Sequence, residues 1–237
     1  IMNLSLKYFN FITPIILLLT YYSAFQNGKP TCNNYLVNSF LYVLSVMCIF
    51  ISSIHIEDTY GLIPDENRIG LFILGIILFF FSIYICIRSN NLILKHLSLL
   101  YIIVFFGLVF QDRYTQYDQE LIEQTLIRTF IVVTIGILFT YKYSHVLKTS
   151  WHKSLIYLSL FLVVLYIIDI VLLQNDHRMI YSYLFLFMYI GYLLYDTKFI
   201  LLRGSQCRGN ADYVGGTLDI FLDLIGIFNQ LLSITDS

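Results

Sequence analysis

Three aspartates near the end of the chain lie at or inside apolar segments. Asp196 closes the run Gly191-Tyr-Leu-Leu-Tyr-Asp-Thr197, and Asp219 and Asp223 lie in an apolar run that follows Asp212-Tyr213. An ionised carboxylate at bilayer depth costs about 3 kcal/mol or more, so acids kept in such segments usually line a cavity or an ion path, or pair with one another. Asp219 and Asp223 are four positions apart, which puts both carboxylates on one helix face.

Proton binding and cation binding are the chemistry that such acids support. Two carboxyl groups at hydrogen-bonding distance do not easily both ionise, so a pair of them holds a single proton near neutral pH. When both are ionised, their oxygens suit Ca²⁺, which prefers oxygen ligands and tolerates irregular geometry. Protonation then competes with calcium and biases a closed against an open packing of the helices.

The composition of the chain requires a membrane scaffold around these acids. Of 237 residues, 58% are hydrophobic and only 12% are charged, whereas soluble domains carry about 25% charge. The chain is therefore predicted to be a polytopic membrane protein. A net charge of -1 provides no basic face, so nucleic acid is not expected as a partner.

Seven apolar stretches have the length of membrane-spanning helices, each about 17 to 22 residues. They lie near 36 to 54, 69 to 87, 92 to 110, 121 to 141, 155 to 173, 179 to 195 and 213 to 234. A shorter apolar segment, at 11 to 25, precedes them and is interrupted by Pro14. We predict an all-α bundle of seven helices plus this short N-terminal apolar segment. Residues 1 to 237 then form a single transmembrane domain, with 1 to 35 as N-terminal segment and loop and 36 to 234 as the bundle.

The loop charges predict the orientation of the helices. By the positive-inside rule Lys29, Arg88 and the basic stretches at 142 to 153 and 198 to 208 share the cytosolic side. This places Asp196 at the cytosolic end of its helix, where the longest loop begins and runs to Asp212.

The cysteines and loop histidines lack the spacing of a metal site. Cys32, Cys48, Cys86 and Cys207 contain no CxxC pair, so neither a metal site nor a disulfide framework is predicted. His145 and His152 lie in the basic loop without metal-ligand spacing, and His96 is expected to be a polar interface residue.

The two linked acidic motifs resemble those of the Bax inhibitor-1 family, also called transmembrane Bax inhibitor motif proteins. The first is the Tyr-Asp-Thr helix end at 195 to 197. The second consists of Asp212-Tyr213 and the final segment Leu218-Asp-Ile-Phe-Leu-Asp-Leu-Ile225. Acids at both 219 and 223 make the Bax inhibitor-1 branch the nearest in pattern. The chain departs from animal members because it ends Thr235-Asp-Ser237, without their lysine-rich tail.

This resemblance implies a function and a site. It implies a non-enzymatic protein, mainly of the endoplasmic reticulum membrane, that acts as a pH-sensitive calcium leak and suppresses cell death. In the family's pattern the two acids that carry over to Asp196 and Asp223 form a hydrogen-bonded pair, so these two are expected to bind Ca²⁺ weakly, with Asp219 near the mouth. The partners implied are membrane lipid, calcium ions, and anti-apoptotic Bcl proteins or calcium-release channels.

Two further charged residues and two other functions remain as alternatives. Asp169 is flanked by apolar residues and is either an accessory to the ion path or a wet residue near a helix end. Arg128 either pairs along its helix with Glu123 or contributes to the acid site. An intramembrane aspartyl protease also uses two membrane aspartates, but the chain lacks its Gly-x-Gly-Asp motif. A non-conducting membrane adaptor that binds apoptosis regulators is the other alternative.

Overall fold

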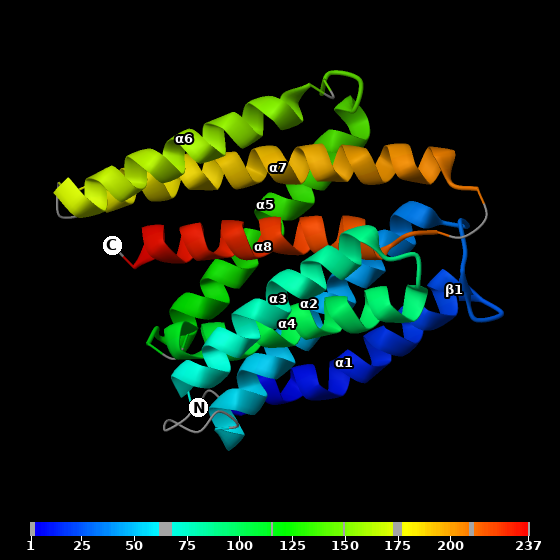
Figure 1. The fold of residues 1–237 in the computed structure, drawn as a ribbon, viewed down its shortest axis with the longest axis horizontal. Coiled ribbons are helices and arrows are strands. Elements are labelled where there is room, and N and C mark those ends of the chain that lie inside the picture. The colour runs from blue at the N-terminus through cyan, green and yellow to red at the C-terminus, as the bar shows by residue number, and fades with distance from the viewer. Residues whose placement is uncertain are drawn as a thin grey trace. The chain divides into compact units, whose positions relative to one another are not determined.

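A computed structural model of the chain describes residues 3–61, 68–114, 116–148, 150–172, 177–208 and 211–236. These residues form eight helices and one two-stranded antiparallel sheet (Figure 1). The helices are α1 (Asn3–Ala24), α2 (Tyr35–Tyr60), α3 (Arg68–Arg88), α4 (Leu92–Tyr114), α5 (Gln119–Tyr143), α6 (Trp151–Leu172), α7 (Arg178–Gln206) and α8 (Val214–Thr235). The strands β1 (Phe25–Gln26) and β2 (Lys29–Pro30) lie between α1 and α2.

The prediction of an all-helical membrane protein is confirmed. Six helices in the described part of the chain are long and apolar enough to cross a membrane: α2, α4, α5, α6, α7 and α8. Shorter apolar stretches occur at Phe11–Ala24 in α1 and Phe72–Arg88 in α3. Helices suit this environment because each satisfies its backbone hydrogen bonds internally, which the hydrocarbon core of a bilayer requires.

Two predicted segments are too short. The N-terminal segment is a helix of 22 residues, because α1 begins at Asn3 and continues through Pro14. Helix α7 does not end where the predicted stretch 179 to 195 ends, just before Asp196. It continues to Gln206 through Phe199, Ile200 and the two leucines that follow, because Lys and Arg at a membrane boundary are good helix formers. Asp196 is therefore an interior residue of α7, and the connection to α8 is the short stretch 207–213.

The chain divides into two compact units, and the predicted single domain of 1–237 remains a prediction. One unit is Ile1–Tyr117 with Cys207–Leu218; the other is Asp118–Gln206 with Asp219–Ser237. In the first unit α2 packs against both α1 and α4, and α3 packs against α4. The contact between α2 and α4 is close: a Cβ at Gly107 would lie 2.9 Å from the carbonyl oxygen of Phe50.

The strands β1 and β2 form a tight hairpin after α1. Asn27 and Gly28 connect them with φ of 52° and 74°, the left-handed conformation that two-residue hairpin turns require. Cys32, just after the hairpin, forms a disulfide with Cys207, 175 positions later in the sequence. The prediction that the cysteines form no disulfide is therefore wrong for this pair, whereas Cys48 and Cys86 are free and buried.

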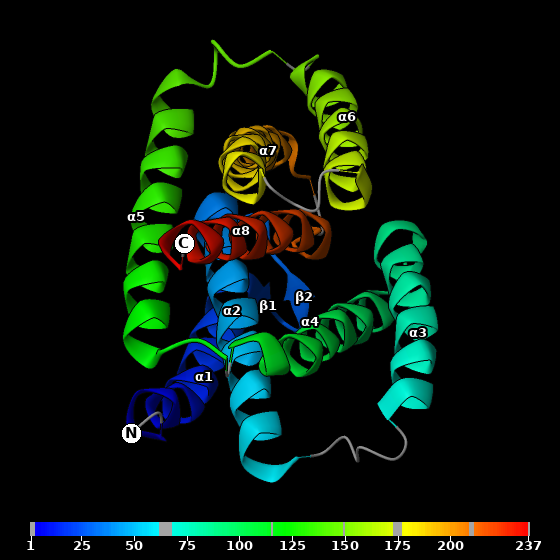
Figure 2. The same ribbon diagram turned by 90° about the vertical axis from the view of Figure 1, so that its left-hand side faces the viewer.

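In the second unit α7 is the central helix. It packs against α5 and against α6, and it lies between them in Figure 2. The residues of α8 that belong to this unit also contact α7. Ser182 of α7 donates a hydrogen bond of 3.1 Å to Ser233 of α8, and Tyr189 of α7 lies against Gly226 of α8. The helices that carry the three aspartates are thus neighbours.

Candidate functional site

Helices α7 and α8 bring the three predicted acids together within the second unit. Asp196 lies 18 residues after the first residue of α7, which corresponds to about 27 Å along the helix. Asp219 and Asp223 lie in the first half of α8. Asp223 is buried, with 5% of its surface exposed, and Asp196 and Asp219 are partly buried.

Asp196 and Asp223 form the closest interaction in this group. A side-chain hydrogen bond joins their carboxyl groups. Because an ionised carboxylate can only accept, this bond requires a proton on one of the two. Oδ2 of Asp223 is buried and has no other hydrogen-bond partner in the described part of the chain. Two carboxyl groups in such contact can hold one proton between them.

Asp219 interacts electrostatically with both members of the pair but faces cationic groups as well. Arg203 and His152 interact with its carboxyl group, and Arg203 also interacts with Asp196. Asp219 is therefore the member of the group next to positive charge. A position of Asp219 near the mouth of the site stays a prediction.

Arg203 belongs to the acid group, and the sequence interpretation missed it by treating it as a loop charge. It follows Asp196 by seven residues on α7, which places both on one helix face, two turns apart. Its guanidinium lies 4.2 Å from the centre of the Phe199 ring. Its Nη1 is buried without a hydrogen-bond partner among the described residues. The spacing of seven would have revealed this residue, had α7 been predicted to continue past Asp196.

His152 was likewise interpreted only as a loop residue. It is an exposed residue in the first turn of α6, and its ring stacks on that of Tyr195 with centres 4.9 Å apart. Tyr195 immediately precedes Asp196, so the stack holds the imidazole near the acids. No sequence spacing predicts this contact, because α6 and α7 meet only in the fold.

A tight side-chain contact between α7 and α8 lies next to Asp223 in the sequence. Gly226 lies one turn after it, and a Cβ at this position would come within 2.5 Å of the Tyr189 ring. Only glycine leaves room for the ring, which also interacts electrostatically with Asp223. Thr197, beside Asp196, is 1% exposed, and its hydroxyl has no hydrogen-bond partner in the described segments. The acids thus lie among tightly packed groups and include unsatisfied oxygens.

Weak calcium binding by the carboxyl oxygens of Asp196 and Asp223 stays a prediction. Among the described residues no cluster of three or more His, Cys, Asp or Glu side chains could hold a metal ion. Ca²⁺ takes six to eight oxygens, so a calcium ion at Asp196 and Asp223 would retain water ligands. Weak binding of this kind suits an ion that passes through.

Asp169 lies apart, in a different buried interaction. It is 1% exposed, near the end of α6, and its carboxylate accepts a hydrogen bond of 3.0 Å from His177 Nδ1. The alternative of a wet residue at a helix end therefore does not hold. The connection between α6 and α7 at 173–176 lies outside the described residues.

Arg128 does not join the acid group. Its Nη1 donates a hydrogen bond of 3.0 Å to the hydroxyl of Thr235, at the last residue of α8. Thr235 is 12 residues beyond Asp223, or about 18 Å along the helix. A direct role of Arg128 in the acid site is not supported by this placement.

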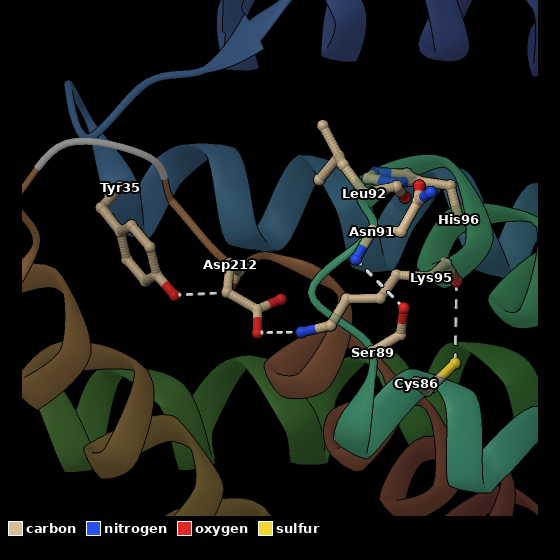
Figure 3. Close-up of polar contacts among 8 residues, drawn as sticks. All are labelled: Tyr35, Cys86, Ser89, Asn91, Leu92, Lys95, His96 and Asp212. Carbon is tan, nitrogen blue, oxygen red and sulfur yellow. Dashed lines mark hydrogen bonds and ion pairs between the residues drawn. The ribbon is translucent and has the colours of Figure 1, made fainter.

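A second group of contacts, in the first unit, holds the linker 207–213 that precedes α8. Lys95 of α4 forms an ion pair of 2.7 Å with Asp212, and the hydroxyl of Tyr35 donates to the Asp212 carbonyl oxygen at 2.8 Å (Figure 3). Ala211 donates its backbone N–H to Pro30 at 3.3 Å. Together with the disulfide, these contacts tie the linker to the hairpin, to α2 and to α4.

Among the described residues of the linker, Tyr213 is the most enclosed, at 3% exposure. Its ring stacks on Tyr35 and Tyr42, with centres 5.1 and 5.0 Å apart. Its hydroxyl donates to the Thr31 carbonyl oxygen and accepts from the Asn38 amide. Burial raises the pKa of this phenol, although the hydrogen bond with Asn38 opposes the rise. Asp212-Tyr213, quoted above as a motif without a role, thus anchors the start of α8.

The loop charges and the disulfide point to different compartments for the linker 207–213. The disulfide between Cys32 and Cys207 joins the region of Lys29 to the end of the 198–208 stretch, which supports the prediction that these segments share one side. The positive-inside rule assigns that side to the cytosol. Disulfides, however, persist in oxidising compartments, whereas cytosolic thiols are kept reduced. The cytosolic assignment and the disulfide are therefore in conflict.

A comparison with protein families identifies a match over most of the chain. The protein family described as "inhibitor of apoptosis-promoting Bax1" matches residues 31–237, which include α2 to α8 and all three aspartates. A search of curated proteins finds no match to the chain.

Proposed function

The chain belongs to the Bax inhibitor-1 family, and we propose that it is a pH-sensitive calcium leak, or a regulator of stored calcium, that suppresses apoptosis. The family is associated with inhibition of apoptosis and consists in general of non-enzymatic membrane proteins. The chain is a multi-pass membrane protein. We propose the endoplasmic reticulum as its membrane.

One observation carries this proposal: Asp196 and Asp223 form a hydrogen-bonded pair between two apolar helices. Two acids in this position cost free energy that a purely structural role would not need. Asp219 lies four residues before Asp223, so the two acids lie on the same face of α8, one helical turn apart. A cation can therefore pass from one carboxylate to the next along this face.

The mechanism follows from competition between a proton and Ca²⁺ for the same oxygens. With one proton shared, Asp196 and Asp223 hold α7 and α8 together. Loss of that proton leaves two like charges, which repel each other and weaken the contact unless a cation lies between them. Calcium, the transported ion, then binds the carboxylate oxygens that have lost the shared proton. The positive charge of Arg203, beside Asp219, limits how strongly the ion is held. The balance of these states changes with pH.

Calcium flux from liposomes that contain the purified protein tests the proposal. We expect release from wild-type liposomes at a rate that changes between pH 6 and pH 8. Asp223→Asn should abolish this pH dependence. Asp236→Asn, a substitution of an exposed acid just after the same helix, should leave it intact.

Two other outcomes would replace the leak proposal. Absence of flux at every pH, together with capture of an anti-apoptotic Bcl protein or a calcium-release channel, would identify a non-conducting adaptor. Cleavage of a transmembrane peptide that depends on both Asp196 and Asp223 would identify a protease.

A further inference from the structure

An apolar cavity of about 330 Å³ lies in the first unit, which does not contain the three aspartates. It is enclosed by α1, α2 and α4, and α2 packs against both of the other helices. The cavity has a buried floor and an exposed rim. Val46, Leu99 and Ile103 of the floor are 4%, 4% and 0% exposed, whereas Leu17 and Leu100 of the rim are 41% and 44% exposed. The cavity therefore opens toward the medium around the helices.

The polar groups of Thr20, Ser45, Tyr42 and His96 in the lining are already hydrogen-bonded. The hydroxyls of Thr20 and Ser45 share a hydrogen bond of 2.7 Å, and each also lies within hydrogen-bonding distance of a backbone carbonyl oxygen of its own helix. Because a hydroxyl has one hydrogen, one of the two donates to the other, which donates to its own carbonyl oxygen. Nδ1 of His96 donates to the Leu92 carbonyl oxygen at 2.7 Å, and its Nε2 accepts from the hydroxyl of Tyr42 at 2.9 Å. Water needs polar partners in order to occupy a cavity. The surface of this cavity is mostly apolar.

The cavity runs from the boundary of the membrane toward its centre. His96 lies 4 residues from the first residue of α4, and Ile103 lies 11 residues from it, or about 16 Å, roughly half the thickness of the hydrocarbon core. Tyr21, Phe25 and Tyr42 line the outer end together with His96. Aromatic rings with a polar edge favour the level of the lipid headgroups. A lipid chain that enters between these rings would therefore extend along the helices toward Ile103.

We propose that this cavity binds one acyl chain of a membrane lipid. A cavity of about 150 Å³ lined by similar side chains binds benzene, so 330 Å³ accommodates on the order of 12 carbon atoms. This is most of one acyl chain but less than half of a sterol. In a bilayer such chains surround the rim, and an empty cavity would forfeit the dispersion contacts of its lining. The acyl chain would fill the gap that α1 and α4 leave over α2.

Fluorescence quenching by a brominated lipid tests the site. The sequence contains a single tryptophan, Trp151, so Trp151→Phe provides a dark background. Leu100→Trp then reports on the rim. Leu97→Trp, on the same helix, is the control reporter, because Leu97 is 56% exposed and does not line the cavity. The probe is lysophosphatidylcholine with bromine on its single chain, added to the protein in a non-ionic detergent.

We expect saturable quenching at position 100, with one lipid per protein, and only weak, linear quenching at position 97. Val46→Phe fills the floor and should weaken binding at position 100 by at least tenfold. Val37→Phe, the matched change at a 58% exposed position of α2, should leave binding intact. Thermal unfolding of both variants checks that they fold, and the comparison of positions 100 and 97 stands without them.

Equal, linear quenching at both reporters would overturn the proposal, because it would show partition into the detergent layer and no site. Displacement of the brominated lipid by a sterol but not by an unlabelled fatty acid would also overturn it, since the occupant would then not be an acyl chain.

Discussion

The disulfide between Cys32 and Cys207 should contribute several kcal/mol to stability, because it closes a loop of 175 residues. The chain-entropy model gives about 5 kcal/mol for a loop of this length. In a bilayer the helices between the two cysteines stay inserted after the bundle dissociates, which restricts the open chain and reduces the entropy that the bond removes. We therefore expect about 2 to 5 kcal/mol. For a protein of this size, that corresponds to a fall in Tm on the order of 5 to 15 °C.

Thermal unfolding of the purified protein in detergent measures this effect. Cys32→Ser, Cys207→Ser and the double variant should all show the same fall in Tm, because each removes the same bond, and a reductant should reproduce it in the wild type. Cys48→Ala, a change at a buried free cysteine, should cost only about 1 kcal/mol.

Peptide mapping without reductant shows whether the bond forms in the cell and so which side of the membrane the linker faces. A bridged Cys32–Cys207 peptide in protein from intact cells would assign the linker to an oxidising compartment, against the positive-inside rule. An unchanged Tm after reduction, with both thiols free in the mapped peptides, would refute the reasoning.

Three further substitutions test the packing of the helices by their effect on thermal unfolding. Gly226→Ala should destabilise the protein by about 1 to 3 kcal/mol, because its Cβ would lie 2.5 Å from the Tyr189 ring; an unchanged Tm would show that the ring moves aside freely. His177→Ala should cost about 1 to 3 kcal/mol, because it leaves the buried Asp169 carboxylate without its partner, although the half-exposed imidazole limits the loss; recovery of stability in a second change, Asp169→Leu, would confirm the cause. Tyr213→Phe should cost about 1 to 2 kcal/mol, because the buried groups that bond its hydroxyl lose a partner; a change below about 0.5 kcal/mol would contradict its role as an anchor.

Helix positions followed from the sequence, because runs of about 20 apolar residues have few alternatives in a membrane. The predicted stretch 92 to 110 and the helix α4 begin at the same residue, and the stretches at 69 to 87 and 213 to 234 agree with α3 and α8 within one residue at each end. The end of α7 could not be predicted in this way: the apolar stretch ends at residue 195, whereas the helix continues to Gln206. A charged residue marks the boundary of the hydrocarbon, but it does not end a helix.

The sequence alone identified the acids of the site, because an ionised carboxylate within an apolar helix costs free energy and therefore stands out. Arg203 was missed only because α7 was ended too early. His152 and the Cys32–Cys207 disulfide could not have been found from spacing, since their contacts join segments that are distant in sequence. The disulfide had one weak signal: the charge pattern already placed both cysteines in segments on the same side of the membrane.

The central claim is that Asp196 and Asp223 act as one unit in calcium passage, and a double-mutant cycle of flux measures this directly. Liposomes containing Asp196→Asn, Asp223→Asn or both should release calcium at the same altered rate, within about twofold, because groups that act as a unit are non-additive. The pH dependence should be absent from all three. Effects that multiply in the double variant, or a wild-type pH profile in either single variant, would contradict the account.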